Sequence, residues 1–499
     1  MHPANPYNTR PDFALLAREH PALAAYVTTG EHGASIDFAD AAALRALTAA
    51  LLKADFGLDV ALRDDRLCPT LANRLDYVLT ALDLVAGLPG PLRVLDIGTG
   101  HVAIYLLLLR FLRPEAQGVG SELDDVSREH AAAVLAANGI AESSIRLVPE
   151  ARGNTLLGWL DDERVPADSW SLTMCNPPFF GSEAEAAEAR ALKAGAPPAG
   201  KTAAHNEEIT RGGEEAFIAQ MVDESVPLGQ RCAWYTSLVG RYASLEPLVA
   251  AVRKVTDNYA VLSLRQARTA RWVLAWSFGP ARADDRLTRP ETVVPGTSFA
   301  RLLPLPNAFV FRPAEAQTVQ ALRAAVMPVL VGVGLAAGDE DVVQLAPVAQ
   351  SWSRAARRAA QREAGRAVGG EPAEGGESDQ APQPPAAHDP PEPLFRARLS
   401  FDPPSVAEPG AALRIDWTWG RDRTTVDALF KFLVSKSGLA GGAGGASGAG
   451  SAKRGADEGD DAAHTEHFAK RGRGRGQGLG RGRGRGGGRA RGRGRGWQQ

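Results

Sequence analysis

The fold of this chain is indicated most clearly by the stretch Leu92-Arg93-Val94-Leu95-Asp96-Ile97-Gly98-Thr99-Gly100. Residues 92–97 predict a buried strand, and the pattern that follows to Leu112 predicts a helix. A glycine-containing turn between a strand and a helix allows the backbone to approach a bound ligand closely. The sequence therefore places a ligand site at the carboxyl end of this strand.

A second strand is predicted over residues 117–122, and it ends in Glu122. In a doubly wound α/β fold, an acid at this position can bind the two hydroxyls of a ribose. Asp96 and Glu122 are 26 residues apart, which fits one strand–helix–strand unit. A helix over 125–138 and a third strand over 145–148 continue the alternation.

A fourth strand, residues 169–175, ends in Asn176-Pro177-Pro178-Phe179. No strand continues through two prolines, because proline lacks the N–H donor of the ladder. The Asn176 side-chain oxygen and the Pro177 carbonyl can then accept the two hydrogens of a planar amino group, against which Phe179 can stack. Such a site suits the amine of adenine, cytosine or guanine, or a glutamine amide. Taken alone, the same residues also fit a simple turn after a strand.

The order of these elements is more informative than any one of them. The series strand–Asp-x-Gly-x-Gly, strand–Glu, strand, strand–Asn-Pro-Pro-Phe is typical of the α/β class I methyltransferases, which have a Rossmann-like doubly wound sheet and use S-adenosylmethionine. The third glycine of a dinucleotide-binding turn is absent. A fifth strand over 231–235 and a hairpin of 261–264 with 271–278 complete the predicted sheet.

Four segments are predicted from changes in composition and pattern along the chain. The N-terminal extension holds an extended polar arm at residues 5–13 and two helices, 40–53, with Asp40 as N-cap, and 67–84. Residues 181–213, which lie within the predicted methyltransferase domain, are interpreted as a substrate lid or a disordered insertion. The segments are 1–85, an RNA-binding arm with helices; 86–280, the methyltransferase domain; 290–439, a small α+β RNA-binding module interrupted by a linker at 356–393; and 440–499, a disordered Gly/Arg-rich tail.

The charge is distributed unevenly along the 499 residues. Residues 470–499 carry ten arginines, one lysine and no acid, so the remaining 469 residues carry a net charge of about −13, although the whole chain is only −2. An acidic body with a basic tail suggests a nucleic-acid partner, because guanidinium groups can line up along phosphates and stack on bases.

Cysteine spacing and hydropathy exclude other classes of protein. Cys68, Cys175 and Cys232 form no Cys-x-x-Cys pair, which argues against a zinc site or a disulfide framework. The longest apolar run, 102–112, is short and is interrupted by Arg110, so neither a metal site nor a membrane span is expected.

Several blocks of sequence match those of a known family. The most specific are Asp55-Phe56-Gly57-Leu58 and Arg268-Thr269-Ala270-Arg271-Trp272-Val273-Leu274-Ala275-Trp276-Ser277-Phe278. The other matching blocks are Pro11-Asp12-Phe13, Arg66-Leu67-Cys68-Pro69-Thr70, Arg74-Leu75-Asp76-Tyr77, Asp96-Ile97-Gly98-Thr99-Gly100, Cys175-Asn176-Pro177-Pro178-Phe179-Phe180 and Gly212-Gly213-Glu214. Over roughly residues 5–280, the chain resembles the RNA adenine-N6 methyltransferases that modify U6 small nuclear RNA, and more distantly the bacterial enzyme for one adenine of 23S ribosomal RNA.

The resemblance implies a role for each matching position. Arg74 would meet the methionine carboxylate of S-adenosylmethionine, and Gly98 would lie under the cofactor. Glu122 would hold the ribose, and Thr155 would lie near the adenine. The implied cofactor-binding set is Arg74, Asp96, Gly98, Gly100, Glu122, Thr155 and Asn176.

The implied catalytic turn is Asn176-Pro177-Pro178-Phe179, where Asn176 binds the target amine and Phe179 stacks on the base. RNA contacts are implied for Arg268, Arg271 and the arm around Arg10.

The chain departs from the family at two places. His101 and Val102 follow Gly100 where the family has small residues, one of them a hydroxyl that touches the cofactor. Asn154 replaces a basic residue of a regulatory loop.

The sequence therefore predicts an RNA N6-adenosine methyltransferase that acts on an unstacked adenine of structured RNA, with U6 small nuclear RNA as its expected target. Two alternatives stay open: a glutamine N5-methyltransferase of a translation release factor, and an RNA-binding regulator with weak turnover. The pairs Lys453-Arg454 and Lys470-Arg471 are spaced like a two-part import signal, so the nucleus is the expected location, with the cytoplasm as a second one.

Overall fold

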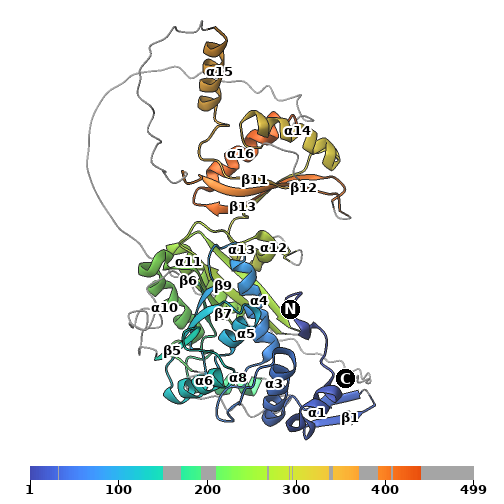
Figure 1. Ribbon diagram of the computed structural model, residues 1–499, viewed down its shortest axis with the longest axis vertical. Helices are drawn as coiled ribbons and strands as arrows, with labels where there is room; N and C mark the ends of the chain where they lie inside the picture. Colours follow the sequence, from blue (N-terminus) through green and yellow to red (C-terminus); the bar gives the residue numbers. More distant parts are fainter. Residues whose placement is uncertain are drawn as a thin grey trace, which may run out of the picture. The chain divides into compact units, whose positions relative to one another are not determined.

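The computed structural model describes residues 1–31, 33–149, 170–192, 209–266, 269–290, 293–294, 296–336, 341–369, 391–405 and 408–439 (Figure 1). The predicted tail, 440–499, lies outside these described residues, as do positions 193–208 of the predicted lid. No helix within the described ranges is long and apolar enough to cross a membrane.

A seven-stranded sheet in the order β5-β4-β3-β6-β7-β9-β8 forms the centre of residues 86–280. Strands β5 to β7 in this order are parallel, β9 is antiparallel to β7, and β8 is antiparallel to β9. The five predicted strands and the hairpin are all confirmed. Their bounds are β3 Arg93–Ile97, β4 Gln117–Glu122, β5 Ile145–Pro149, β6 Trp170–Cys175, β7 Cys232–Val239, β8 Tyr259–Gln266 and β9 Thr269–Trp276.

Helices cover both faces of this sheet. Alternate residues of β3 face different cores: Val94 packs with α4 and α5, whereas Leu95 and Ile97 pack with α10 and α11. A strand that is buried on both faces needs a continuous apolar run, which explains the composition of β3. The helices are α4 Leu71–Val85, α5 Ile104–Leu112, α6 Asp125–Ala137, α8 Glu183–Leu192, α10 Gly213–Leu228 and α11 Tyr242–Val255, and the 3-10 helix η2 is Gly229–Arg231.

The N-terminal extension packs against the sheet domain through α3, Ala41–Phe56, and α4. The predicted cap of α3 is confirmed, because the Asp40 side chain accepts hydrogen bonds from the Ala42 and Ala43 amides.

The predicted arm at residues 5–13 is not extended throughout, because residues 6–8 form a 3-10 helix and an α-helix begins at Phe13. The Asp12 side chain caps a helix by accepting from the Ala14 and Leu15 amides, and Phe13 and Leu16 are buried. Asn5, only 2% exposed, anchors the start of the chain by donating to the Ala72 carbonyl on α4 at 3.0 Å. The elements are η1 Pro6–Asn8, α1 Phe13–Glu19, α2 Pro21–Ala24, β1 Val27–Gly30 and β2 Gly33–Ile36.

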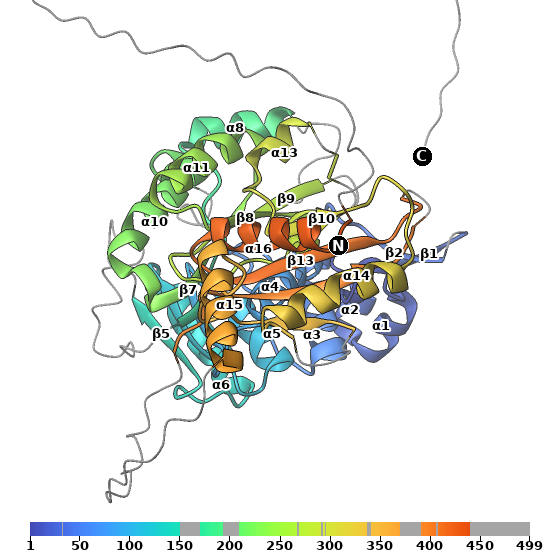
Figure 2. The same ribbon diagram turned by 90° about the horizontal axis from the view of Figure 1, so that it is seen from above.

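A second, antiparallel sheet in the order β10-β13-β12-β11 forms the core of residues 308–436. Phe395, Ala397, Leu399 and Phe401 alternate along β12 and are all buried, so one face of the sheet is apolar. Helices α14 and α16 pack on this face and against each other (Figures 1 and 2). The bounds are β10 Ala308–Phe311, α14 Val319–Gly332, β11 Val343–Leu345, β12 Phe395–Asp402, β13 Ala412–Gly420 and α16 Arg423–Lys436, preceded by α12 Asp285–Thr288 and α13 Ser298–Leu302.

The first part of the predicted linker at 356–393 is a helix, α15, Arg354–Gly369. Alanine and arginine are strong helix formers, and both are frequent here. The start of α15 is also anchored, because the Arg357 Nε donates to the carbonyl of the buried Trp352 at 3.2 Å. Residues 370–390 of the predicted linker lie outside the described part of the chain.

Candidate active site

The predicted cofactor turn follows β3 and contains three residues in the left-handed region. Gly98 and Gly100 have φ values of 68° and 71°, and Ala103, at the start of α5, has φ 49°. A Cβ atom built on Gly98 or Gly100 would meet no atom within 4 Å, so the space above both glycines is open. The turn therefore offers bare backbone to a ligand, as the sequence predicts.

Asp96 is fully buried at the base of this turn. Its Oδ2 accepts a hydrogen bond from the Thr99 hydroxyl at 2.6 Å, while its Oδ1 has no partner among the described residues. Burial raises the pKa of Asp96 to about 7, although the Thr99 hydrogen bond and the positive charge of Arg74 both oppose the rise. An unpaired buried carboxylate oxygen is costly, so a bound ligand with a donor or a positive charge would stabilise the site.

Glu122 connects the end of β4 to the same turn. Its two carboxylate oxygens accept from the Gly100 amide at 2.8 Å and the Asp124 amide at 2.9 Å. Burial raises the pKa of Glu122, while these amide hydrogen bonds lower it. Each oxygen retains acceptor capacity, which fits the predicted binding of ribose hydroxyls.

Arg74 reaches the cofactor side of the site from α4. Its guanidinium donates to the Tyr105 hydroxyl at 3.0 Å and lies 5.6 Å from the Tyr105 ring centroid. The positive charge of Arg74 also lowers the pKa of Asp96, against the effect of burial.

The predicted catalytic turn leaves the sheet beside the cofactor turn. In the parallel pairing of β3 with β6, Ile97 lies opposite Cys175, so Gly98 and Asn176 are the next residues on neighbouring strands. Asn176 and Phe179 are half-buried, and the Asn176 side chain has no hydrogen-bond partner among the described residues. Within the described part of the chain, the amide oxygen therefore retains its full capacity to accept hydrogen bonds.

Tyr77, fully buried on α4, fixes the end of β6. Its hydroxyl lies 2.7 Å from the Thr236 hydroxyl and accepts a hydrogen bond from the Cys175 amide at 3.3 Å. The Cys175 amide thus has a partner at the point where the strand ends, immediately before Asn176.

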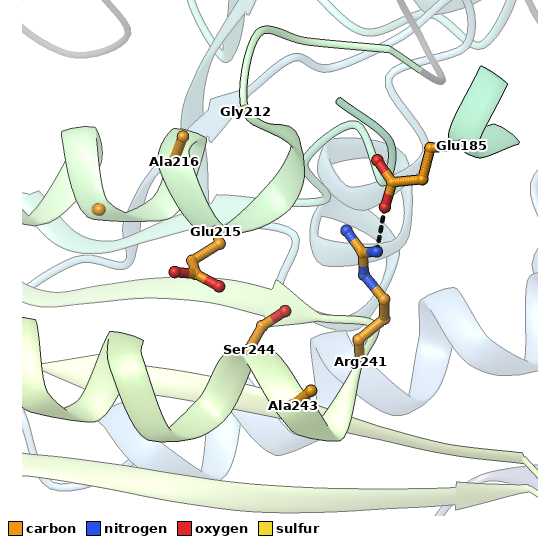
Figure 3. A pocket seen from close by; sticks show the side chains of 8 residues that line it. Glu185, Gly212, Glu215, Ala216, Arg241, Ala243 and Ser244 are labelled. Atoms are coloured by element: carbon orange, nitrogen blue, oxygen red, sulfur yellow. Dashed lines mark hydrogen bonds and ion pairs between the residues drawn. The ribbon is translucent and has the colours of Figure 1, made fainter. Parts of the chain in front are cut away.

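Arg241, Glu214 and Glu185, to which the sequence assigned no role, belong to a group of polar side chains near the Phe179 turn. Arg241 donates to the Phe179 carbonyl at 2.8 Å, and the buried Glu214 accepts from the Gly240 amide at 2.7 Å. Figure 3 shows Arg241 reaching from the start of α11 to Glu185 on α8. The Gly212-Gly213-Glu214 block was the one sequence signal for this group, and it carried no role.

A cavity of about 410 Å³ adjoins this group (Figure 3). It is lined by Glu185, Gly212, Glu215, Ala216, Ala219, Arg241, Ala243 and Ser244.

The predicted RNA contacts are placed less uniformly. Arg10 is exposed; it donates to the Ala34 carbonyl at 3.0 Å and stacks over Phe13. Arg271 is half-buried, which lowers its pKa, and it donates to the Gly240 carbonyl at 3.2 Å. Thr155 and Arg268 lie outside the described residues.

The comparisons agree with this geometry. Residues 1–280 match the family model described as RNA methyltransferase. The chain belongs to this RNA methyltransferase family. The predicted resemblance and the class I methyltransferase fold are both confirmed.

Two curated relatives and one solved structure illustrate the range of the family. The chain is 36% identical over 283 residues to the zebrafish RNA N(6)-adenosine-methyltransferase mettl16, covering 56% of this chain and 59% of that protein. It is 34% identical over 309 residues to Ribosomal RNA large subunit methyltransferase F of Pseudomonas putida GB-1, covering 57% of this chain and 94% of that protein. The structure of the hMettl16 catalytic domain in complex with MAT2A 3'UTR hairpin 1 matches with a TM-score of 0.50 and 33% identity, over 56% of this chain and 95% of that chain.

The cofactor of this RNA methyltransferase family is S-adenosylmethionine, as predicted. The described residues fit it on three counts: the open backbone over Gly98 and Gly100, the unpaired Asp96 Oδ1, and the acceptor capacity of Glu122. Metal ligands do not cluster in the described ranges.

The departure at His101 has an electrostatic consequence. His101 is 2% exposed, its Nε2 has no partner among the described residues, and burial lowers its pKa to about 4. Because this value lies below the ordinary 6.5, the unfolded chain binds more protons between the two values, and stability falls as the pH falls through that window.

Replacing His101 by alanine removes this loss of stability. From pH 7 to pH 5, the free energy of unfolding of the wild type should therefore drop by about 2 kcal/mol relative to His101→Ala, measured by urea unfolding. If the free energy of unfolding changes equally with pH in the two proteins, the lowered pKa of His101 is contradicted.

A Tyr77→Phe substitution should lower the free energy of unfolding by about 1–2 kcal/mol, because it removes a buried hydroxyl that accepts a hydrogen bond from the Cys175 amide and pairs with the Thr236 hydroxyl. Methyl transfer should weaken as well, since Asn176 follows Cys175 directly. Denaturant unfolding and initial rates test both. The matched control is Tyr242→Phe, which removes an exposed hydroxyl that pairs with the Ser298 hydroxyl and should cost little. Equal effects of the two substitutions would show that the Cys175 contact has no special weight.

Proposed function

We propose that this protein is an RNA adenine-N6 methyltransferase that transfers the methyl group of S-adenosylmethionine to an unstacked adenine of structured RNA. The observation that supports the proposal most strongly is the register of β3 and β6, in which Gly98, proposed to lie under the cofactor, and Asn176, proposed to bind the amine, follow paired residues of neighbouring strands. The chain spans 59% of the length of its zebrafish relative, so the whole activity of that protein is transferred here only as a proposal.

The chemistry requires alignment more than acid–base catalysis. S-adenosylmethionine supplies an electrophilic methyl group on a sulfonium, and the adenine amine is a poor nucleophile because its lone pair is delocalised into the ring. Acceptance of both amine hydrogens by the Asn176 oxygen and the Pro177 carbonyl would localise that lone pair and direct it at the methyl carbon. The carbon–sulfur bond breaks as the carbon–nitrogen bond forms, and the surplus proton leaves to water.

The target base must leave its stack to reach this turn, where Phe179 can stack on it. A loop or bulge of an RNA is therefore the proposed substrate. We extend the proposal to U6 small nuclear RNA and to the nucleus, on the resemblance, the Arg-Gly tail and the paired basic residues near the C-terminus. The release-factor alternative finds no support in a family of RNA methyltransferases.

The proposal is tested by incubating the protein with methyl-labelled S-adenosylmethionine and total RNA, followed by nucleoside analysis. The wild type should place label in N6-methyladenosine, and Asn176→Ala should reduce the rate by about 10²–10³-fold, because an acceptor aimed at the reacting amine is lost. RNA binding by the variant should persist. Label in a release factor would favour the glutamine reading. RNA binding without any transfer would favour the regulator.

We also propose that the C-terminal module contributes to RNA affinity. Arg354, Arg358 and Arg362 lie one turn apart on α15 and are all exposed, and none has an ion-pair partner among the described residues. Such a stripe matches the spacing of phosphates along a strand and would act without reading sequence.

Replacing Arg354, Arg358 and Arg362 together by alanine should reduce the slope of log affinity against log salt by about 2, because each phosphate contact contributes about 0.7–0.9. Fluorescence anisotropy with the methylated RNA between about 50 and 200 mM salt measures this slope. The control is Lys431→Ala on α16, where the lysine is already paired with Asp427 at 2.6 Å. If the slope of log affinity against log salt is unchanged in the triple variant, these arginines of α15 do not contact RNA phosphates.

A further inference from the structure

Glu214 is a fully buried acid whose carboxylate accepts hydrogen bonds from the loop before α11 and from the first turn of that helix. Its Oε2 accepts from the Gly240 amide at 2.7 Å, and its Oε1 accepts from the Arg241 amide at 3.0 Å and the Ser244 hydroxyl at 2.8 Å. A buried carboxylate with this many donors is held firmly, and so are the donors. Glu214 thus fixes the loop that connects β7 to α11.

Gly240, in that loop, lies directly against the ring of Phe179. A Cβ atom built on Gly240 would be 3.0 Å from both Cδ1 and Cε1 of Phe179, and 3.0 Å from the Glu214 Oε2. The φ of Gly240 is not in the left-handed region, so an alanine there would be resisted by its neighbours and not by backbone strain. Only the absence of a side chain lets the ring occupy its place.

Arg241 and Arg271 complete the support. Arg241 donates to the Phe179 carbonyl at 2.8 Å, so the same loop holds both the ring and the backbone of Phe179. Arg271, on β9, donates to the Gly240 carbonyl at 3.2 Å, so both polar groups of the Gly240 backbone are occupied. The Phe179 turn is therefore held by α10, the β7–α11 loop and β9.

We propose that Glu214, Gly240 and Arg241 are positioning residues that set the plane of the Phe179 ring, and with it the plane of the stacked target base. This inference rests on the proposed function, in which Phe179 stacks on the base. The base presents its amine to the cofactor edge-on, so a tilt of the supporting ring moves the amine away from the line of the breaking carbon–sulfur bond. The three residues touch neither cofactor nor amine and act through Phe179.

The most direct test is Gly240→Ala, with Gly87→Ala as the matched control. A Cβ on Gly87, an exposed residue after α4, would meet no atom within 4 Å. Arg241→Gln removes the support of the Phe179 carbonyl, and Arg241→Lys should restore part of it by returning one long cationic donor. Gly240→Ala should lower kcat for RNA methylation by about tenfold, because displacements of a few tenths of an ångström to 1 Å are costly in a near-attack geometry. The KM for S-adenosylmethionine and the thermal midpoint should stay close to the wild-type values.

A second readout follows the ring itself. Full-length protein with 4-fluorophenylalanine at position 179 gives a fluorine resonance that reports the surroundings of the ring, with or without RNA. Gly240→Ala should shift this resonance, and Gly87→Ala should not.

The outcomes separate the inference from the proposed function. A shifted resonance together with a lower kcat and an unchanged cofactor KM supports the positioning role. An unshifted resonance would show that Gly240 does not set the position of the Phe179 ring. A shifted resonance with full kcat would show that the position of the ring does not control methyl transfer. If the wild type itself transfers no methyl group to any RNA, the proposed function fails, and the positioning role in catalysis fails with it. If Gly240→Ala and Arg241→Gln both lower the thermal midpoint, and Arg241→Lys recovers no activity, the role of these residues is merely structural.

Discussion

Parallel pairing of β3 with β4 and β6 governs the arrangement of this site. Ile97 lies opposite Ser121 on one side and Cys175 on the other, so three chain segments leave the sheet at the same level. The Thr99 amide donates to the Ser121 carbonyl at 2.8 Å and extends the pairing into the turn. A slip of one register would move a ligand group on one strand away from those on its neighbours. The register of the strands thus sets where the site lies, and the sequence motifs supply the side chains at that place.

Two buried acids give this edge its electrostatic character. Asp96 and Glu122 both have a pKa raised chiefly by burial, and the charge of Glu122 adds to the rise at Asp96. Three hydrogen bonds already offset part of the cost of burying this pair, but the Asp96 Oδ1 has no partner among the described residues. S-adenosylmethionine carries an ammonium, a sulfonium and two ribose hydroxyls, so its binding would compensate the cost. Any ligand that binds the folded state and donates to these acids should therefore stabilise the protein.

The sequence predicted the cofactor side of the site well because that side is local. Asp96, Gly98, Gly100 and Glu122 lie within one strand–helix–strand unit, and hydrophobic pattern alone located every strand of the sheet. The helical turns of the N-terminal arm were not predicted, since a polar composition concealed the Asp12 cap and the burial of Asn5 against a helix nearly seventy residues away. Helix α15 differs from the linker predicted there because alanine and arginine favour a helix even in a segment of low complexity.

The base side was not predictable in the same way, because it is assembled from distant parts of the chain. Phe179, Glu214, Gly240 and Arg271 come from four separate elements, and no spacing rule connects a carboxylate on α10 to a glycine after β7. Gly240 is informative only as a missing side chain, which a single sequence cannot display. The two sides meet at Asn176 and Phe179, where a local motif ends and a long-range support begins. Methyl transfer needs both within a few tenths of an ångström, so changes in the support can alter catalysis while every recognisable motif is intact.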